Sequence, residues 1–341
     1  MQNLKASNPV FIIGSERSGT NLLRTLLSNH SHLYAPLSPH FIQEFGRVCR
    51  FYAPLSNKVN ARHLFDDMLA LANHPYSNWS LELSFDHAWE KYRPSCFLDY
   101  FSLLYLEAAY KAGKAAYVCK EINIWDHIFN ILNYFDNPRF LYLYRDPRDC
   151  AASWMAKPMF IRTAYDAVNN WCYEQDIVAE LRGVHGVDMH PVKYEELVAE
   201  PARIMRGVLE YIRAAVESQC FDTIGEKSEG MSWNPYWENL FRPVNADSTG
   251  RYREILHGGT IKMVETIAKH NMQSLGYSLE TNADWISPRH MKFINSARRL
   301  IVLARKRRHI YGRMSLLHSK VSLIRRLQIN ARQRFRATRS Q

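Results

Sequence analysis

The chain has 341 residues, 47% of them hydrophobic and 13% aromatic, a composition typical of a folded globular protein with a sizeable core. Its six cysteines are widely spread and include no Cys-x-x-Cys pair, which argues against a zinc site and fits reduced thiols in a cytoplasm. No run of about 18 apolar residues occurs, and the residues before position 10 are mostly polar, so we expect neither a membrane-spanning helix nor a signal peptide.

The net charge of +11 is concentrated at the C-terminal end. Residues 287–341 contain 16 Lys or Arg and no Asp or Glu, whereas the residues before them carry a net charge of −5. We therefore expect two units, a body over residues 1–286 and a basic helical tail over residues 287–341.

The body begins with a predicted strand, a short polar loop and a helix. Residues 10–13 form a continuous apolar run, as in a parallel strand that is buried on both faces. Gly14 and Gly19 permit a sharp turn, and Ser18 and Thr20 are placed to cap the helix. The N–H groups of such a helix start can hold one anion. The stretch therefore predicts a phosphate-binding loop, with an anion-free turn as the alternative.

The loop has the spacing of the Walker A motif, Gly-x-x-x-x-Gly-Lys-[Ser/Thr], but lacks its lysine. Thr20 stands in the lysine position, so ordinary ATP or GTP chemistry would lose the charge that binds the β- and γ-phosphates. The nearest cation lies upstream, at Arg17.

The rest of the body alternates strands with helices. A loop with two prolines occupies 30–41, and 60–115 is helical in pattern; strands are predicted at 115–120, 139–144 and 189–194, and helices at 163–182 and 201–216. This alternation predicts a parallel sheet with right-handed crossovers, whose ligands gather at the carboxyl ends of the strands.

A second anion motif follows the strand at 139–144. Arg145 stands at the end of the strand, and Ser153 comes eight residues later, in a helix for which Pro147 is a suitable first-turn residue. A guanidinium and a hydroxyl at this spacing can share one phosphate. The alternative is an Arg145 that pairs with Asp146 or Asp149.

Together these two motifs resemble those of sulfotransferases that use 3′-phosphoadenosine 5′-phosphosulfate (PAPS). The resemblance spans roughly residues 8–279 and implies a three-layer α/β, P-loop-like fold in which helices flank a central parallel sheet. It also implies PAPS as the sulfuryl donor, without a metal. The donor-binding residues that it implies are Ser15, Arg17, Ser18, Gly19, Thr20, Asn21, Arg145 and Ser153.

A third segment, 241–252, resembles the closing loop of tyrosylprotein sulfotransferases. Its position implies a cofactor contact for Arg251, and the same comparison implies nucleotide contacts for Lys157 and Tyr194. For Tyr194 a place in the core is an equal alternative, and Lys157 could be an ordinary exposed lysine.

In these relatives a strand-end lysine stabilises the leaving group, and Lys120 matches it, together with Arg17. A salt bridge of Lys120 with Glu121 or with another surface acid is the alternative. The usual base, a glutamate about twenty residues after the loop arginine, is replaced by Ser38. We expect His40 to act as the base, with Glu44 as its competitor.

The basic tail shows an apolar stripe within a surface otherwise rich in arginine and lysine. Leu303, Ile310, Leu317 and Ile324 recur every seven residues, with Met314 and Val321 between them. Three alternatives remain open: packing on the body or a second subunit, contact with an anionic membrane surface, or binding of an acidic acceptor. A membrane or partner role is favoured, which would make the protein cytoplasmic or peripheral at a membrane. Nothing supports nucleic-acid binding.

The sequence therefore predicts a sulfotransferase that modifies a hydroxyl of a carbohydrate, lipid or other small acceptor. Its acceptor pocket is expected in the variable helical regions, 41–112 and 155–180. A P-loop kinase-like nucleotide transferase and a catalytically degenerate binding module are the two alternatives.

Overall fold

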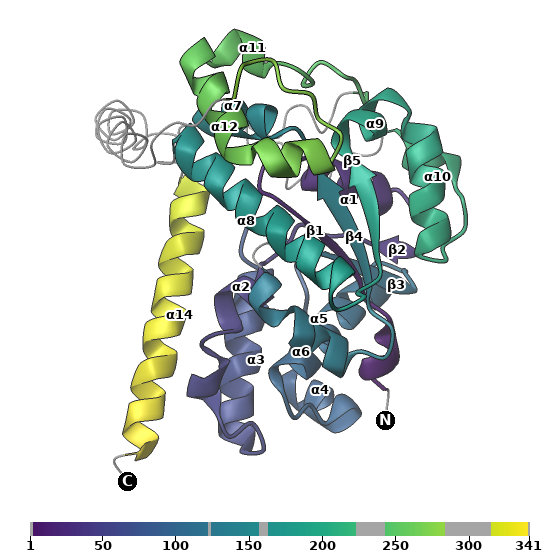
Figure 1. Cartoon of the computed structure of the whole chain (residues 1–341). Helices are drawn as coiled ribbons and strands as arrows, with labels where there is room; N and C mark the ends of the chain where they lie inside the picture. Colours follow the sequence, from purple (N-terminus) through teal and green to yellow (C-terminus); the bar gives the residue numbers. More distant parts are fainter. Residues whose placement is uncertain (1–2, 122–123, 157–162, 223–242, 284–314, 340–341) are drawn as a thin grey trace.

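The computed structural model describes residues 3–121, 124–156, 163–222, 243–283 and 315–339. Their centre is a five-stranded parallel sheet with the order β2-β3-β1-β4-β5 (Figure 1). The strands are β1 (Val10–Gly14), β2 (Leu33–Tyr34), β3 (Ala116–Lys120), β4 (Arg139–Tyr144) and β5 (Met189–Lys193). Since all four strand pairings are parallel, the carboxyl ends of the strands all lie at the same end of the sheet.

Helices and short 3-10 turns connect the strands. The helices are α1 (Thr20–Ser28), α2 (Phe41–Phe45), α3 (Lys58–Ala72), α4 (Phe85–Tyr92), α5 (Phe97–Lys111), α6 (Ile128–Tyr134), α7 (Pro147–Ala156), α8 (Ala164–Gly183), α9 (Tyr194–Ala199), α10 (Pro201–Tyr211), α11 (Tyr252–Ile255), α12 (Gly258–Ser274) and α14 (Ser315–Arg339). The 3-10 turns are η1 (Lys5–Ser7), η2 (Cys49–Tyr52), η3 (Trp125–His127) and η4 (Ser218–Phe221).

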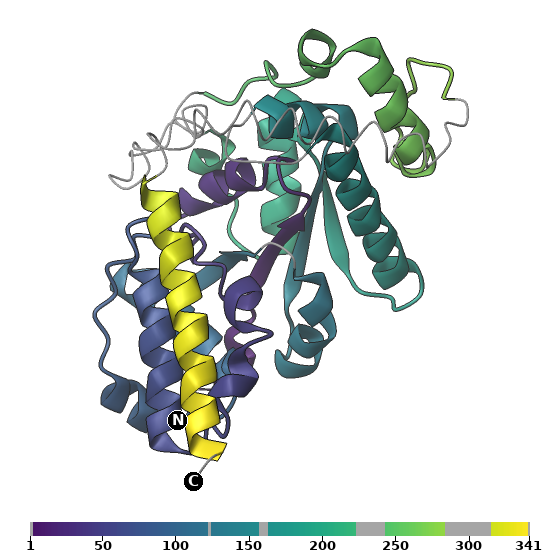
Figure 2. The same ribbon diagram turned by 90° about the vertical axis from the view of Figure 1, so that its left-hand side faces the viewer.

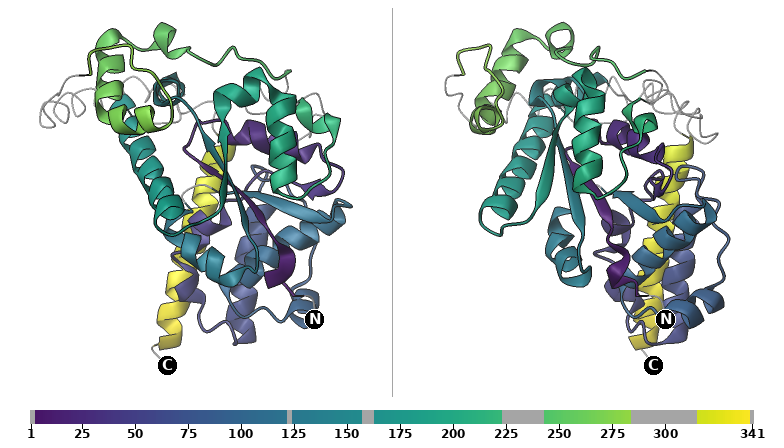
Figure 3. Two further views of the ribbon diagram at one scale, coloured as in Figure 1. Left: turned by 45° about the vertical axis from the view of Figure 1, so that its right-hand side comes forward. Right: turned by 90° about the vertical axis from the view of Figure 1, so that its right-hand side faces the viewer.

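The sheet is buried on both faces, as its continuous apolar runs predict. In β1, Phe11 and Ile13 belong to one core cluster, while Val10 and Ile12 belong to the other. The first cluster includes side chains of α3, α5 and α8, and the second includes side chains of α1 and α10. Figure 3 shows α8 and α10 on opposite sides of the strands. The predicted three-layer α/β architecture is therefore confirmed.

The sequence predicted four of the five strands and missed the edge strand β2. The runs at 10–13, 115–120, 139–144 and 189–194 all form strands, and the long helix and the Pro147 helix start are confirmed. The two-residue strand β2 was missed within the proline-containing loop, because only its pairing with β3 distinguishes it from an extended loop.

The C-terminal helix α14 packs against the body beside α3 (Figures 1 and 2). Its inward side is formed by the buried residues Lys320, Leu327 and Ala331. The prediction of an apolar stripe is confirmed at Ile324, which packs against the core. It is wrong at Val321, whose side chain is 38% exposed. Leu303, Ile310 and Met314 lie outside the described residues, and so does the side chain of Leu317. Of the three alternatives for the tail, the described part shows packing on the body.

All six cysteines are free thiols. Within the described ranges, no helix combines the length and the apolar character that crossing a membrane requires.

Candidate active site

The loop between β1 and α1 forms the first half of the site. Gly19, with φ 106°, is the N-cap of α1, so the prediction that Ser18 or Thr20 caps this helix is wrong. The Ser18 hydroxyl instead donates to the Ser15 carbonyl oxygen within the loop. No described side chain caps α1, which begins at Thr20 and continues with Asn21. This helix start is therefore built from backbone N–H groups, as a phosphate loop requires.

Arg17 links this loop to the second motif. The backbone of Arg17 is left-handed, with φ 72°. Nε of Arg17 donates to the hydroxyl oxygen of Ser153 on α7 at 3.1 Å. Nη1 of Arg145 donates to the carbonyl oxygen of Arg17 at 3.3 Å. Burial, together with the positive charge of Arg145, lowers the pKa of Arg17. The two motifs predicted to bind separate phosphates therefore meet at the carboxyl ends of β1 and β4.

Arg145 is 7% exposed and is held by contacts on several sides. Its guanidinium carbon lies 4.3 Å from the centre of the Tyr194 ring, and Nη2 lies 3.9 Å from a carboxylate oxygen of Asp149. The predicted alternative, pairing with Asp149, is thus present as a long contact. Nε of Arg145 is buried without a hydrogen-bond partner among the described residues. One donor of this guanidinium consequently remains available to a ligand.

Tyr194 packs against the loop as well as against Arg145. It is buried at the start of α9, and a methyl group added to Gly19 would lie 2.4 Å from a carbon of its ring. The close approach of the Tyr194 ring requires glycine here. Tyr194 therefore supports both halves of the site, whether or not it also touches a nucleotide.

The segment predicted as a closing loop lies over Arg145. The carbonyl oxygen of Ser248 accepts a hydrogen bond from Nη2 of Arg145, and Asp149 accepts from the backbone N–H groups of Gly250 and Tyr252. Arg251 is exposed and makes no ion pair with the described residues. Lys157 lies outside the described residues, as do positions 241 and 242.

Lys120 ends β3 beside the loop. Burial, with a contribution from the positive charge of Arg24, lowers its pKa to about 8. Lys120 forms no ion pair with a carboxylate of the described chain, so the alternative of a Lys120–Glu121 salt bridge is not realised. A partly buried lysine that retains its charge up to about pH 8 is suited to stabilise negative charge on a leaving group.

Glu121 lies immediately after β3 and is 1% exposed. Its carboxylate accepts hydrogen bonds from the Ser38 hydroxyl at 3.2 Å and from the backbone N–H of Ile42 at 3.2 Å. Burial raises the pKa of Glu121 to about 7. A carboxylate from another part of the chain is therefore bonded to the serine that stands in the position of the relatives' glutamate.

His40 and Glu44 lie at the start of α2. His40 has φ 64°, its backbone N–H donates to the Ser38 hydroxyl, and its Nδ1 is buried without a hydrogen-bond partner among the described residues. Burial and the charges of Lys320 and Lys120 hold the pKa of His40 well below its ordinary value. Glu44 is partly buried, and burial raises its pKa. His40 is therefore neutral near pH 7 and has a ring nitrogen able to accept a proton.

The family profile described as "Sulfotransferase family" matches residues 9–218, which is more than half of the chain. The chain belongs to the sulfotransferase family. This is a family of PAPS-dependent transferases, and both anion motifs lie within the matched region.

Two solved sulfotransferase domains share the fold. The domain of the Synechococcus PCC 7002 olefin synthase is 20% identical with a TM-score of 0.52, over 77% of this chain and 96% of that one. The domain from the curacin biosynthetic pathway is 16% identical with a TM-score of 0.53, over 79% and 98%. No curated protein sequence matches the chain.

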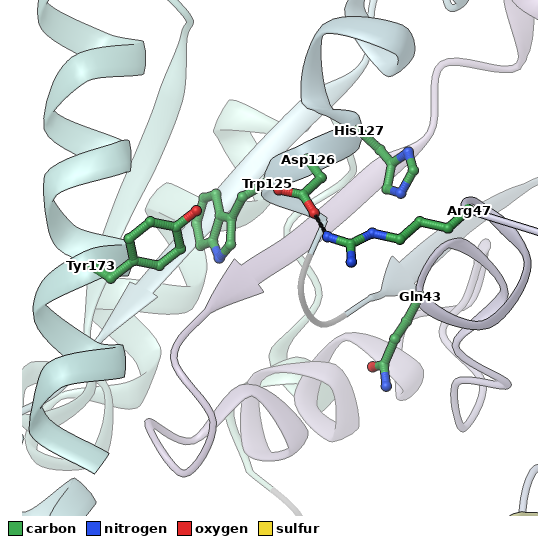
Figure 4. A pocket seen from close by; sticks show the side chains of 6 residues that line it. All are labelled: Gln43, Arg47, Trp125, Asp126, His127 and Tyr173. Atoms are coloured by element: carbon green, nitrogen blue, oxygen red, sulfur yellow. Dashed lines mark hydrogen bonds and ion pairs between the residues drawn. The ribbon is translucent and has the colours of Figure 1, made fainter. Parts of the chain in front are cut away.

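A cavity of about 350 Å³ opens in this sulfotransferase between α2, η3 and α8 (Figure 4). Its lining residues are Gln43, Arg47, Trp125, Asp126, His127 and Tyr173. Arg47 and Asp126 form an ion pair across it. Gln43, Arg47 and Tyr173 fall in the regions expected to form the acceptor pocket, whereas the η3 residues do not. The lining combines two aromatic rings with polar and charged groups.

Sequence reasoning missed three buried charged groups: Glu121 as a bonded partner of Ser38, Glu174 on α8, and Lys320 on α14. Glu174 is 3% exposed, burial raises its pKa to about 7, and one carboxylate oxygen lacks a partner among the described residues. For the two helical residues, the spacing could have indicated burial, because residues three or seven positions apart lie on the same face of a helix. Glu174 is three residues after buried Trp171, and Lys320 is seven residues before buried Leu327.

Proposed function

We propose that the chain transfers the sulfuryl group of PAPS to a hydroxyl of a carbohydrate, lipid or other small acceptor. The observation that carries this proposal is the meeting of Arg17, Ser153 and Arg145 above an uncapped helix start. Arg145 is buried and Arg17 is partly buried, and the repulsion between their two guanidinium groups favours an anionic ligand between or beside them. Arg145 also keeps one buried donor without a partner. A nucleotide with two separate phosphate groups fits this chemistry.

Each part of the site has a proposed role in binding the donor. The 5′-phosphosulfate end belongs at the loop, where Ser15, Arg17, Ser18, Gly19, Thr20 and Asn21 surround the start of α1. Arg145 and Ser153 would hold the 3′-phosphate, and Tyr194, Lys157 and Arg251 are the remaining proposed nucleotide contacts. Since the Ser18 hydroxyl bonds within the loop, its contribution would come from its backbone and from loop shape.

When bound, PAPS supplies the sulfuryl group and leaves as adenosine 3′,5′-bisphosphate. The new bond joins the acceptor oxygen to sulfur, and the sulfur–oxygen bond to the 5′-phosphate breaks. Arg17 and Lys120 stabilise the negative charge on that departing oxygen. The departing phosphate oxygen does not need to be protonated while the Lys120 ammonium stays charged.

His40 is proposed to take the proton from the acceptor hydroxyl, with Glu44 as the competing base. The neutral imidazole of His40 has an available nitrogen at Nδ1. Its lowered pKa makes it a weaker base in equilibrium terms, but keeps it in the proton-accepting form across the neutral range. The cavity at α2 and α8 is the proposed acceptor site, since Gln43 lies between His40 and Glu44 in the sequence and lines it.

The test of donor binding is isothermal titration with adenosine 3′,5′-bisphosphate and with ATP. Micromolar bisphosphate binding with much weaker ATP binding is expected, and Arg145→Met should weaken the bisphosphate by about 30- to 1000-fold, for a loss of about 2–4 kcal/mol. Arg203→Met is the control, because Arg203 is exposed and its ion pairs with described residues are those with Glu196 and Glu200. Equal or stronger ATP binding would favour the kinase-like alternative.

The test of the base is His40→Ala, compared with Glu44→Gln. His40→Ala should abolish turnover and leave bisphosphate affinity intact, whereas Glu44→Gln should retain turnover. Near-normal turnover in His40→Ala would remove His40 from the mechanism. Tight bisphosphate binding by the wild type, without transfer to a panel of hydroxyl acceptors, would favour the degenerate binding module, which the replacement of the usual glutamate by Ser38 also favours.

A further inference from the structure

Glu121 is a buried carboxylate whose hydrogen bonds reach a distant segment of the chain, residues 38–42. It is 1% exposed. Its Oε1 accepts from the Ser38 hydroxyl and its Oε2 from the backbone N–H of Ile42, both at 3.2 Å. The Tyr105 hydroxyl on α5 donates to Oε1 at 3.4 Å. A buried carboxylate needs such donors in place of water, so Glu121 and the segment 38–42 hold each other.

The segment 38–42 carries His40 in a conformation that needs support from outside. His40 is the N-cap residue of α2 and has φ 64°, which is unfavourable for a residue other than glycine. The helix that follows has five residues, too few to be stable without tertiary contacts. The backbone N–H of His40 donates to the Ser38 hydroxyl oxygen at 3.0 Å. Ser38 therefore connects the backbone of His40 to the Glu121 carboxylate.

Glu121 binds this segment at the end of the sheet where the phosphate loop begins. Ile12 of β1 pairs with Lys120 of β3, and the two strands are parallel neighbours. Glu121 lies one residue past that pair, and β1 ends two residues past it, at Gly14. Neighbouring strands are about 5 Å apart. The bonds to Glu121 consequently keep the segment of His40 at the strand ends that also carry Lys120 and the loop.

The rest of α2 is held by contacts that do not involve Glu121. Phe41, Ile42 and Phe45 are buried in the first core cluster. Nε2 of Gln328 on α14 donates to the carbonyl oxygen of Glu44 at 3.2 Å, so the C-terminal helix holds the far end of α2. Loss of the Glu121 carboxylate should therefore loosen the start of α2, where His40 lies, while the helix stays on the body.

From these contacts we infer that Glu121 is a positioning residue of the active site. Its carboxylate fixes Ser38 and the first turn of α2, and thereby holds the His40 imidazole where Nδ1 can take the proton from the acceptor hydroxyl. Glu121 itself takes no proton in this step. The inference rests on the proposed sulfuryl transfer, with His40 as the base, for its catalytic consequence. The hydrogen bonds and their effect on the segment do not depend on that proposal.

The experiment compares Glu121→Ala with Glu121→Gln and with Asp99→Ala in the full-length chain. Asp99 is the matched control, because this buried carboxylate also accepts from a serine hydroxyl and from backbone N–H groups, those of Ser95 and Cys96, at the start of another helix, α5. Turnover, the affinity for adenosine 3′,5′-bisphosphate and amide hydrogen exchange are measured for each variant. Exchange is followed at the starts of α2 and α5.

Glu121→Ala should lower kcat by about 100-fold, the scale expected when a catalytic group is misplaced by about 1 Å. Bisphosphate affinity should not change, and the amides of His40 and Ile42 should exchange faster. Glu121→Gln should recover most of the lost turnover, because its amide has the same shape and keeps an oxygen for the Ile42 N–H. Asp99→Ala should speed exchange at the start of α5 and leave both kcat and the exchange of segment 38–42 unchanged.

Unchanged exchange of segment 38–42 in folded Glu121→Ala, or a kcat near that of the wild type, would overturn the inference. So would a Glu121→Gln variant that loses turnover as completely as Glu121→Ala, since the carboxylate would then have a chemical role.

If Glu121→Ala does not fold, Ser38→Ala decides. It removes the hydroxyl that links the His40 N–H to Glu121, so it should speed exchange at His40 and lower kcat; no change in either would contradict the inference. Failure of the proposed function is distinguishable, because it appears as absent bisphosphate binding or absent transfer in the wild type. The exchange rates are measured without donor or acceptor.

Discussion

Gly19 gives the most direct test of the loop geometry, because two separate features of the structure forbid a side chain there. Its φ of 106° is unfavourable for alanine, and strain of this kind costs roughly 1–2 kcal/mol. An added methyl group would also lie 2.4 Å and 2.7 Å from two ring carbons of Tyr194, and relieving such overpacking costs about 1–3 kcal/mol. Gly19→Ala should therefore lower the free energy of unfolding by about 2–5 kcal/mol.

The same substitution should weaken donor binding. Displacing the Tyr194 ring disturbs its stacking with Arg145, a cation–π contact worth about 0.5–2 kcal/mol, so the affinity for adenosine 3′,5′-bisphosphate should fall about 2- to 30-fold beyond any effect on the loop itself. Urea unfolding and isothermal titration measure the two effects. Gly183→Ala is the control, because nothing lies within 4 Å of the added methyl group at the end of α8.

A double variant separates strain from overpacking. Adding Tyr194→Leu to Gly19→Ala removes the ring and should recover the overpacking part of the stability loss, while the backbone strain and the weakened binding remain. Wild-type stability and affinity in Gly19→Ala would refute the proposed contact between this loop and Tyr194.

Three further predictions concern buried and partly buried charges. Turnover should fall as the pH rises through about 8, because Lys120 loses its proton there. Lys120→Arg should shift this alkaline fall in turnover to higher pH. An unshifted fall would mean that another group causes it. Burial raises the pKa of Glu174 from 4.5 to about 7, so the free energy of unfolding should fall by about 3 kcal/mol as the pH rises between these values. Glu174→Gln should reduce this fall, as measured by urea unfolding at pH 5 and pH 8. Arg148→Met should destabilise the fold by about 3–5 kcal/mol, because it leaves the buried carboxylates of Asp146 and Glu265 without their shared partner; a small change in the urea midpoint would contradict this.

The sheet and the turn between β1 and α1 could be predicted from the sequence because their signals are local. An apolar run such as 10–13 indicates a strand buried on both faces, and the glycines that bound the following turn indicate where a backbone must bend. Arg145 and Ser153 are related by the fixed geometry of a strand end and the helix after it. These features need only neighbouring residues, so the sequence by itself determined the fold class and the positions of the two motifs that we propose bind the donor.

The contacts between distant segments were decided only by the tertiary structure. Tyr194 reaches Gly19 and Arg145 across the sheet edge, Glu121 bonds to Ser38 across 83 residues, and Lys320 arrives from the other end of the chain. No spacing rule relates such positions, because the register of one segment on another depends on the shapes of all the side chains between them. Burial then sets the protonation of these groups, which is why the charges at the site follow from the folded packing rather than from composition.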